Sequence, residues 1–252
     1  MSFTAGPEAY DRFMGRYSTP LAPRFADFAS IGGAQRVLDV GCGPGAMTGE
    51  LVRRFGAESV SAVDPSPGFV EAAADRHPGV DVRRAEAESL PFERGLFDAA
   101  LAQLVVHFMS DPAAGIGEMR RVTRRDGVVA ACVWDHAGGA GPLARFWGAA
   151  RELDPEAADE SDLPGARGGD LERLLRGAGL VDVEERLLTV EVEHESFEEW
   201  WEPFTLGIGP AGAYVQGLTQ DARDRLRERC RELHPAAPFA VSASAWAARG
   251  VV

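Results

Sequence analysis

The amino-acid sequence predicts an α/β protein with a doubly wound, mostly parallel sheet that carries helices on both faces. From residue 36 onward, short apolar runs typical of buried strands alternate with segments of helical periodicity. A glycine-rich stretch, "GCGPGA", joins the first of these runs to the helix that follows it. Such alternation is typical of parallel strands linked by helices. The 252 residues suffice for one large domain of this class, or for one domain with a substantial insertion.

Seven segments have the composition of strands, and they predict a seven-stranded sheet. The first five are short and apolar or alternating, whereas the last two are longer and alternate along their length. The predicted strands are residues 36–40, 59–64, 80–85, a run that begins at 96, 127–135, 181–195 and 239–250.

Helices are predicted between these strands from apolar periodicity and from start and stop signals. Asp111 is suited to cap a helix that has proline at its first position, and Ser196 with Glu199 fits a capping box. The first 35 residues favour one or two further helices. The other predicted helices are residues 45–56, 67–79, 111–127, 143–154, 170–180, 196–204 and 219–235.

This pattern predicts that the chain has three parts. Residues 1–35 form a helical segment over one end of the sheet, and residues 36–135 form the core. Residues 136–252 belong to the same domain and add the last strands and a helical cap. Within that part, residues 155–169 are acidic and poor in apolar side chains, which predicts a mobile loop.

Composition excludes several classes of function. The net charge is −13 and the chain has no lysine, which disfavours binding to nucleic acid. The local basic run at 120–125 is interpreted as the solvated end of a helix. The three cysteines lie far apart and match neither a disulfide framework nor a zinc site, and no metal is predicted. No stretch predicts a membrane span, and the first residues lack the apolar core of a signal peptide, so a cytoplasmic protein is expected.

The glycines lie where a parallel sheet binds its ligands, beyond the carboxyl end of the first strand. Gly41, Gly43 and Gly45 permit a tight turn with exposed backbone N–H groups. The stretch also fits the loose dinucleotide pattern G-x-G-x-x-A, which is a weak signal alone. Asp64 ends the second strand, near the position at which an acid that binds a ribose is expected.

Charge around the glycines favours a cationic ligand. Asp39 stands two residues before the first glycine, and a carboxylate there attracts a cation and repels a pyrophosphate. Glu86 and Glu88 are predicted on the same rim, and no arginine or lysine is expected on its helix side. The ligand should therefore carry a ribose and a positive charge, and S-adenosylmethionine carries both.

Four stretches resemble, in order and spacing, the successive motifs of class I S-adenosylmethionine-dependent methyltransferases, most closely the type 11, UbiE-like branch. The resemblance covers residues 36–135, and the N-terminal segment is also similar to that of bacterial members. It implies a Rossmann-like fold and transfer of a methyl group from S-adenosylmethionine, which leaves S-adenosylhomocysteine. The stretches are "VLDVGCGPGAMT", "VDPSPGFVEAA", "AEAESLPFERGLFDAALAQLVVHF" and "MRRVTRRDGVVAACVWD".

The same resemblance assigns most of the donor site. The three glycines would bear on the methionine part of the donor, and Asp39 would face its ammonium group. Asp64 would accept from the two ribose hydroxyls, with Pro65 and Ser66 beside the adenine.

The remaining donor contacts are also implied by the resemblance. Glu86 and Ala87 stand where the family usually has Asp-Ala, and Glu86 would accept from the adenine amino group. The other contacts come from the fourth strand and the N-terminal segment. Gln103 and Leu104 would lie near the transferring methyl, while Tyr10 and Arg16 would close over the donor carboxylate.

The candidates for acid–base chemistry are His107 and His136, each of which has a structural role as its alternative. Methyl transfer needs a base only if the nucleophile must lose a proton. Five aromatic residues could either line an acceptor pocket or belong to the core. These are Phe146, Trp147, Trp200, Trp201 and Phe204.

The sequence predicts a small, neutral or cationic, partly hydrophobic acceptor that is methylated on oxygen, nitrogen or carbon. Two alternatives remain open. One is an NAD-dependent oxidoreductase, although the chain has no lysine for a catalytic Tyr/Lys pair. The other is a non-catalytic binding protein with a methyltransferase-like fold.

Overall fold

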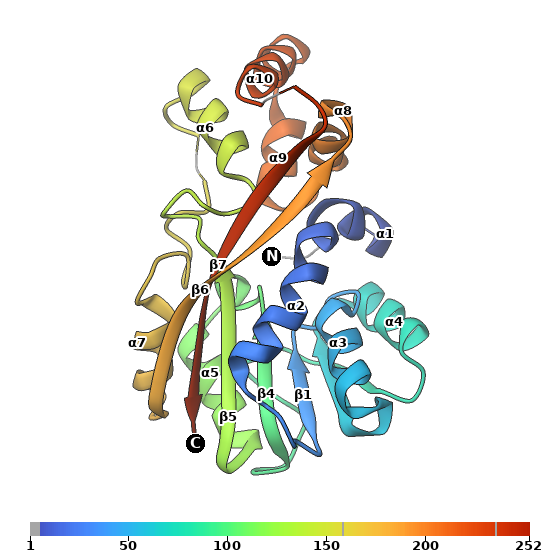
Figure 1. Cartoon of the computed structure of the whole chain (residues 1–252), viewed down its shortest axis with the longest axis vertical. Helices are drawn as coiled ribbons and strands as arrows, with labels where there is room; N and C mark the ends of the chain where they lie inside the picture. Colours follow the sequence, from blue (N-terminus) through green and yellow to red (C-terminus); the bar gives the residue numbers. More distant parts are fainter. Residues whose placement is uncertain (1–5, 158, 235) are drawn as a thin grey trace.

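A computed structural model describes residues 6–157, 159–234 and 236–252. Its centre is one seven-stranded sheet with the strand order β3-β2-β1-β4-β5-β7-β6 (Figure 1). This confirms the predicted α/β class and the number of strands. The strands are β1 (Val37–Val40), β2 (Val60–Asp64), β3 (Asp81–Arg84), β4 (Phe97–Gln103), β5 (Thr123–Trp134), β6 (Val181–His194) and β7 (Phe239–Val251).

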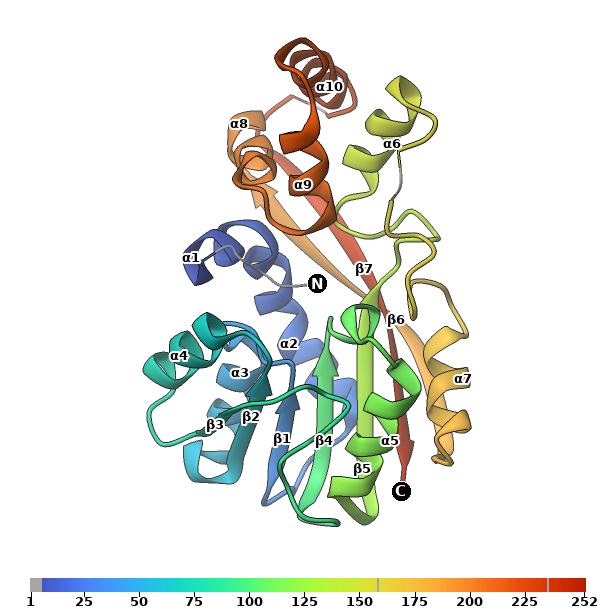
Figure 2. The same ribbon diagram turned by 180° about the vertical axis from the view of Figure 1, so that it is seen from behind.

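Helices cover both faces of the sheet, as predicted (Figures 1 and 2). Buried side chains of α2 and α3 pack on one face, and those of α5 and α7 pack on the other. The helices are α1 (Pro7–Tyr10), α2 (Arg16–Ala29), α3 (Ala46–Phe55), α4 (Pro67–Arg76), α5 (Pro112–Val122), α6 (Ala144–Leu153), α7 (Asp170–Gly177), α8 (Phe197–Trp201), α9 (Gly209–Gly217) and α10 (Gln220–Glu232). A π-helical turn, η1 (Asp11–Gly15), joins α1 to α2, and short 3-10 turns η2 (Ala57–Ser59), η3 (Val106–Phe108) and η4 (Glu202–Leu206) occur elsewhere.

The directions of the strands indicate where a ligand site is expected. Strands β1 to β5 pair in parallel, whereas β7 runs antiparallel to both β5 and β6. The chain builds outward from β1 to β3 and then returns to place β4 on the other side of β1. A parallel sheet binds ligands at such a reversal, beyond the carboxyl ends of the strands. The carboxyl ends of β1 and β4 are therefore the expected centre of a site.

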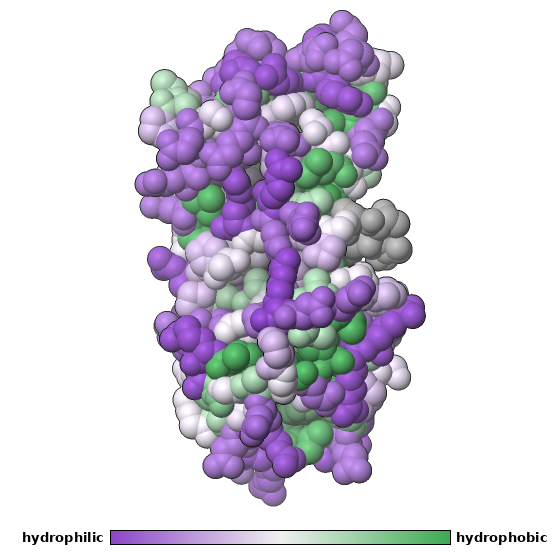
Figure 3. All heavy atoms as spheres, turned by 90° about the vertical axis from the view of Figure 1, so that its right-hand side faces the viewer, coloured by the Kyte–Doolittle hydropathy of each residue, from purple (hydrophilic) through white to green (hydrophobic). Residues whose placement is uncertain are grey.

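The last two strands carry the cap. Strands β6 and β7 extend together beyond the parallel strands, and α6, α8, α9 and α10 gather around their far ends (Figure 1). The cap thus lies beyond the carboxyl ends of β1 and β4, and α1 lies between the cap and the parallel sheet (Figure 2). On the face shown in Figure 3, hydrophilic residues cover much of both ends of the molecule, with smaller apolar patches between them. No helix among the described residues is long and apolar enough to cross a membrane.

One predicted boundary is wrong, one helix was not predicted, and one predicted loop is more buried than expected. The helix expected over residues 111–127 ends at Val122, and β5 begins at Thr123, so the basic run is divided between a helix and a strand. The Thr123 hydroxyl donates to the Met119 carbonyl, which ends the helix. Helix α9 was not predicted, because its glycine-rich stretch lacks apolar periodicity. Described residues of the acidic segment 155–169 contain no helix or strand, as expected, but several of them are buried.

Candidate functional site

The carboxyl ends of β1 and β4 hold two buried polar side chains. Asp39 lies on β1 opposite Leu101 of β4, and Gln103 lies two residues further along β4. Asp39 is 1% exposed and Gln103 is 8% exposed. Adjacent parallel strands therefore bring both side chains to the reversal point of the sheet.

Each of these side chains has a buried oxygen without a hydrogen-bond partner among the described residues. The Thr48 hydroxyl donates to Asp39 Oδ2 at 2.6 Å, while Oδ1 is unpaired. The amide nitrogen of Gln103 donates to the Ser18 carbonyl at 3.1 Å, while Oε1 is unpaired. Buried acceptors without a donor are costly, so this pair points to a ligand that supplies N–H or O–H donors.

Burial also shifts the ionisation of Asp39. Its pKa is raised to about 7, chiefly because burial disfavours the carboxylate, and the Thr48 hydrogen bond opposes the shift. A cationic ligand beside the carboxylate would reverse this shift, because an opposite charge stabilises the ionised form. Asp39 is therefore suited to hold a cation.

The three glycines of the loop differ in what surrounds them. A Cβ at Gly41 would lie 2.4 Å from a Val105 methyl carbon, and one at Gly45 would lie 2.7 Å from the His77 ring. A Cβ at Gly43 would have nothing within 4 Å, although its φ is +53°. Packing thus requires glycine at two positions, whereas Gly43 leaves its backbone open to a ligand.

Asp64 binds the loop itself. Its two carboxylate oxygens accept from the backbone N–H groups of Gly43 at 2.9 Å and Ser66 at 2.8 Å. Burial raises its pKa, these two hydrogen bonds lower it, and the charge of Glu86 raises it. Each oxygen keeps a second lone pair, so the contacts leave capacity to accept from hydroxyl groups. Its hydrogen bonds to the backbone and the binding of a ligand are thus compatible for this residue.

The residues predicted beside the adenine lie around Asp64. Glu86 follows β3 and is exposed, and its charge reaches Asp64. Ala87 is buried beside it, whereas Pro65 is exposed. The structure thus brings the ends of β2 and β3 together, as the sequence predicted.

The N-terminal segment covers this end of the sheet. Tyr10 packs edge-to-face on Phe69 of α4, with ring centres 5.4 Å apart. Burial raises the pKa of Tyr10, and the charge of Asp64 adds to the shift. Asp11 pairs with Arg76 at 2.6 Å, and Arg76 also donates to the Pro44 carbonyl in the glycine loop. The prediction that no arginine reaches this rim was therefore wrong.

Arg16 occupies a different place from the one predicted. Its guanidinium contacts His194 at 2.8 Å and Glu199 at 2.9 Å, at the end of β6 and in α8. These contacts join α2 to the cap. In this arrangement the partners of the Arg16 guanidinium belong to β6 and α8, and neither belongs to the glycine loop.

A small cavity of about 40 Å³ lies between the end of β4, the N-terminal segment and the cap. It is called the histidine cavity below. Leu104 forms part of its wall and has a φ of +62°, a conformation that a branched side chain rarely adopts. Such strain is retained chiefly at functional sites. Its lining includes Tyr10, Leu104, His107, His136, Glu160 and Ile208.

Both predicted histidines line this cavity. The ring centres of His107 and His136 are 6.0 Å apart. Burial lowers the pKa of His107 to about 3 and that of His136 to about 4, so both rings are neutral near neutral pH. Nδ1 of His107 and Nε2 of His136 are buried without a hydrogen-bond partner in the described chain.

Sequence reasoning missed Glu160, which comes from the segment predicted as a mobile loop. It is 4% exposed, and its Oε2 accepts from the Trp147 indole N–H at 3.0 Å. Its Oε1 lies 4.0 Å from His136 Nε2. The only signal in the sequence was its position after the fifth strand, and the surrounding acidic residues obscured it.

The aromatic residues of the cap form a core. All five are buried, and Phe146 stacks on Phe204 with ring centres 4.5 Å apart. None of the five lines the cavity that holds the histidines. Trp200 and Phe204 face a neighbouring hollow beside Arg16. The structural interpretation of these residues is the better one.

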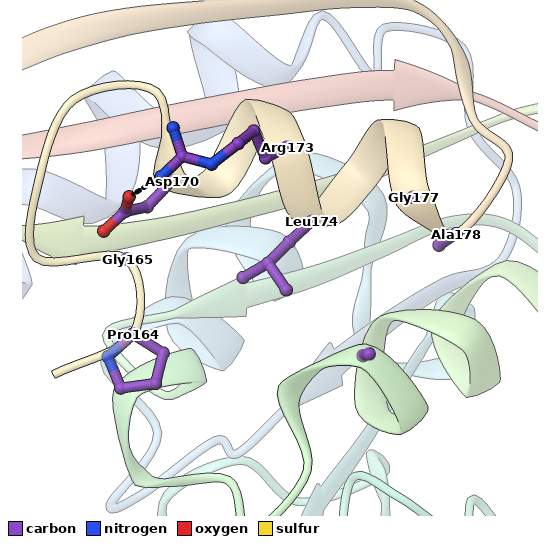
Figure 4. Close-up of a pocket in the computed structure, with 8 residues that line it drawn as sticks. Pro164, Gly165, Asp170, Arg173, Leu174, Gly177 and Ala178 are labelled. Atoms are coloured by element: carbon purple, nitrogen blue, oxygen red, sulfur yellow. Dashed lines mark hydrogen bonds and ion pairs between the residues drawn. The ribbon is translucent and has the colours of Figure 1, made fainter.

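A larger hollow of about 410 Å³ lies elsewhere, between α7 and the start of α5 (Figure 4). Asp170 and Arg173 on its rim pair with each other, and Leu174 points into it (Figure 4). It contains none of the predicted site residues. Size alone therefore does not identify the functional site here.

Comparisons with known proteins agree with the sequence motifs. The family model described as a methyltransferase domain matches residues 38–131. The chain is 38% identical over 95 residues to the chloroplastic 2-methyl-6-phytyl-1,4-hydroquinone methyltransferase 2 of rice. This match covers 37% of this chain and 27% of that protein. It is 31% identical over 128 residues to malonyl-[acyl-carrier protein] O-methyltransferase of Hahella chejuensis. This match covers 50% of this chain and 46% of that protein. The chain spans less than half the length of either relative.

The fold is also similar to that of solved structures. The YcgJ protein of Bacillus subtilis superposes with a TM-score of 0.59 at 19% identity, over 93% of this chain and 97% of that one. Identity this low shows the fold alone. The matched segment contains the glycine loop, Asp39, Asp64, Glu86 and Gln103, which is the rim described above. Residues 38–131 of this chain are therefore similar to the methyltransferase domain family.

Proposed function

We propose that this protein transfers a methyl group from S-adenosylmethionine to a small-molecule acceptor. One observation carries the proposal: inside the matched segment, the unpaired oxygens of Asp39 and Gln103 lie at the strand ends that flank the glycine loop. An ammonium group supplies the N–H donors and the positive charge that these two acceptors lack. A pyrophosphate supplies neither.

The other parts of the donor follow from this placement. The backbone at Gly43 has open space for the methionine part, and the free lone pairs of Asp64 suit two ribose hydroxyls. The adenine would lie between Ser66 and the Glu86–Ala87 pair. When bound, S-adenosylmethionine supplies a methyl group on a sulfonium, which is already activated for displacement. The protein then contributes chiefly position and exclusion of water.

We also propose that residues 7–29 cover the donor and that the cap after residue 135 selects the acceptor. Tyr10 lies against α4 beside Asp64, which supports the first assignment. The histidine cavity is bounded by the start of α9, which supports the second. Its walls are mainly apolar, and the relatives are named for a phytyl hydroquinone and for a malonyl group on a carrier protein. A mostly apolar, uncharged acceptor fits these walls.

The NAD-dependent alternative has less support. Arg76 is the one arginine whose contact with the glycine loop is seen among the described residues, and Asp11 already neutralises it. A pyrophosphate on this loop would also face Asp39. The anionic rim therefore favours a cationic donor.

Calorimetric titration with S-adenosylmethionine, S-adenosylhomocysteine and NAD tests the proposal. We expect the two sulfur ligands to bind at micromolar concentration and NAD not to bind. Asp64→Ala should lose this binding, because it removes both the predicted ribose acceptor and the anchor of Gly43. Binding of NAD in place of the sulfur ligands would support the oxidoreductase, and binding of none of them would contradict a donor site.

Two glycine variants should separate packing from ligand contact. Gly41→Ala should lower the free energy of unfolding by about 1–3 kcal/mol, because the new methyl overlaps Val105. Gly43→Ala should cost only about 1–2 kcal/mol, from its left-handed backbone, but should weaken donor binding. Urea unfolding and calorimetry measure the two effects. Undiminished donor affinity in Gly43→Ala would show that no ligand approaches this backbone.

A further inference from the structure

The cavity lined by His107 and His136 also contains a buried carboxyl group, that of Glu160. Glu160 is nearly inaccessible, and the Trp147 indole fixes one of its oxygens at 3.0 Å. The other oxygen, Oε1, lies 4.0 Å from His136 Nε2. Trp147 comes from α6 and His136 follows β5, so elements outside its own loop contact the carboxyl group.

Two further polar atoms of the same cavity are unsatisfied. His107 Nδ1 and His136 Nε2 are buried without partners in the part of the chain that the structure describes. The side chain of His136 is 5% exposed, and His107 is 7% exposed. An unpaired buried nitrogen is destabilising, and a ligand group that donates or accepts a hydrogen bond there removes this penalty. The cavity is thus prepared for a polar group on an otherwise apolar molecule.

We propose that Glu160 is the catalytic base of the methyl transfer and that the acceptor is a mostly apolar molecule methylated on a hydroxyl oxygen. This inference rests on the proposed methyltransferase function. His107 and His136 would hydrogen-bond the hydroxyl as neutral rings, and Trp147 would hold the carboxylate in position.

The ionisation of the cavity groups supports Glu160 over either histidine as the base. Burial raises the pKa of Glu160 to about 7; the Trp147 hydrogen bond lowers it, and the charge of Asp159 raises it. A base is most effective when its pKa lies near the working pH. The histidines, with their lowered pKa values, bind a proton weakly.

The balance of the step also favours a hydroxyl. The hydroxyl gives its proton to Glu160 Oε1, and its oxygen forms a bond to the methyl carbon. The bond between the methyl group and sulfur breaks, and its electron pair remains on sulfur. A carboxylate and a sulfonium thereby become a carboxylic acid and a neutral thioether. A neutral amine attacks through its lone pair without first losing a proton, so it has no need of this base.

The cavity walls select the rest of the acceptor. Phe13, Trp134 and Ile208 line it and are at least nine-tenths buried. A hydroxylated aromatic molecule satisfies both the walls and the unpaired nitrogens. The present 40 Å³ is smaller than such a molecule, so some of the lining side chains must move to admit it. Phe13, one of these side chains, lies in the π-helical turn. A π-turn at this position is consistent with a moving part of a site.

The test uses the whole chain, radiolabelled S-adenosylmethionine, and phenol and naphthol with their amine counterparts, aniline and naphthylamine. Wild-type protein should methylate at least one of the two hydroxyl compounds in preference to its amine. Its kcat should rise with pH through about 7, because only the ionised carboxylate accepts a proton. Glu160→Gln should lower kcat by about a hundredfold or more and remove this rise, while calorimetry shows unchanged donor affinity.

Glu156→Gln is the matched control, because Glu156 is an exposed glutamate of the same loop. It should retain the wild-type rate and pH profile. Equal rates and profiles in Glu160→Gln and wild type would overturn the role of Glu160. Donor binding without transfer to either hydroxyl compound, or with preferred transfer to the amines, would overturn the acceptor class. If the wild type fails to bind the donor, the proposed function fails first, and this inference fails with it.

Discussion

Replacing Asp39 by asparagine is expected to weaken the binding of S-adenosylmethionine by at least about thirtyfold, or about 2 kcal/mol. The carboxylate is 1% exposed, and its free oxygen has no partner among the described residues. An ammonium group buried beside an asparagine would lack its counter-charge. Calorimetric titration of wild type and variant at neutral pH measures the difference directly.

The same substitution should remove a pH dependence. In the free protein the pKa of Asp39 is raised to about 7, and a bound cation lowers it. Wild-type affinity should therefore increase from pH about 5 to about 7, whereas that of Asp39→Asn should show no such increase. The effect on folding has the opposite sign: the raised pKa stabilises the protonated fold below 3.8, and this contribution is lost as the pH rises through about 7.

A matched control uses Asp75, an exposed aspartate of α4. Asp75→Asn changes the net charge by the same amount and should leave both the affinity and its pH profile unchanged. Equal losses in the two variants would mean that overall charge, and not the buried carboxylate, attracts the donor. An unchanged affinity in Asp39→Asn would contradict the placement of the ammonium group.

Replacing Phe146 by alanine should lower the free energy of unfolding by about 3–5 kcal/mol, the usual cost of a large buried ring. Phe146 is fully buried, stacks on Phe204 at 7° and packs edge-to-face on Trp147. Urea unfolding followed by tryptophan fluorescence measures the change. Because Trp147 holds Glu160, a variant that remains folded should also lose methyl transfer before it loses donor binding.

Leu153→Ala provides the comparison on the same helix, since Leu153 is 46% exposed. It should change the free energy of unfolding by less than about 1 kcal/mol. A cost below this value for Phe146→Ala would contradict a cap with its own packed core. Two separate unfolding transitions would show that the cap unfolds independently, against the prediction that residues after 135 belong to the same domain.

Local sequence patterns were sufficient for most of the fold. Each of the seven strands has its own apolar or alternating pattern, and the sheet confirms all of them. Errors occurred where local preference and tertiary context differ. The helical pattern continues past Val122, yet Thr123 pairs with Phe97 of β4 and begins β5. Helix α9 was missed because the stretch around Gly209 and Gly212 lacks a helical pattern.

The position of the candidate rim was predictable because its residues lie at or near the ends of strands. Asp39, Asp64 and Gln103 stand at fixed positions on parallel strands, so chain order alone brings them to one edge of the sheet. The partners of other polar side chains depend on distant segments. The contacts of Arg76 with Asp11 and of Arg16 with Glu199 span 65 and 183 residues and carry no local pattern.

By itself, then, the sequence determined the class of the fold, the order of its elements and the edge at which a cationic, ribose-bearing ligand is expected. These follow from periodicity and from short spacings, which neighbouring residues encode. Only the tertiary structure decided that Gly43 is the open glycine, that the cap aromatics are core and that Glu160 lies with two histidines. Such contacts form when whole elements pack, and burial then sets the ionisation of Asp39 and Glu160 far from that of the same residues in water.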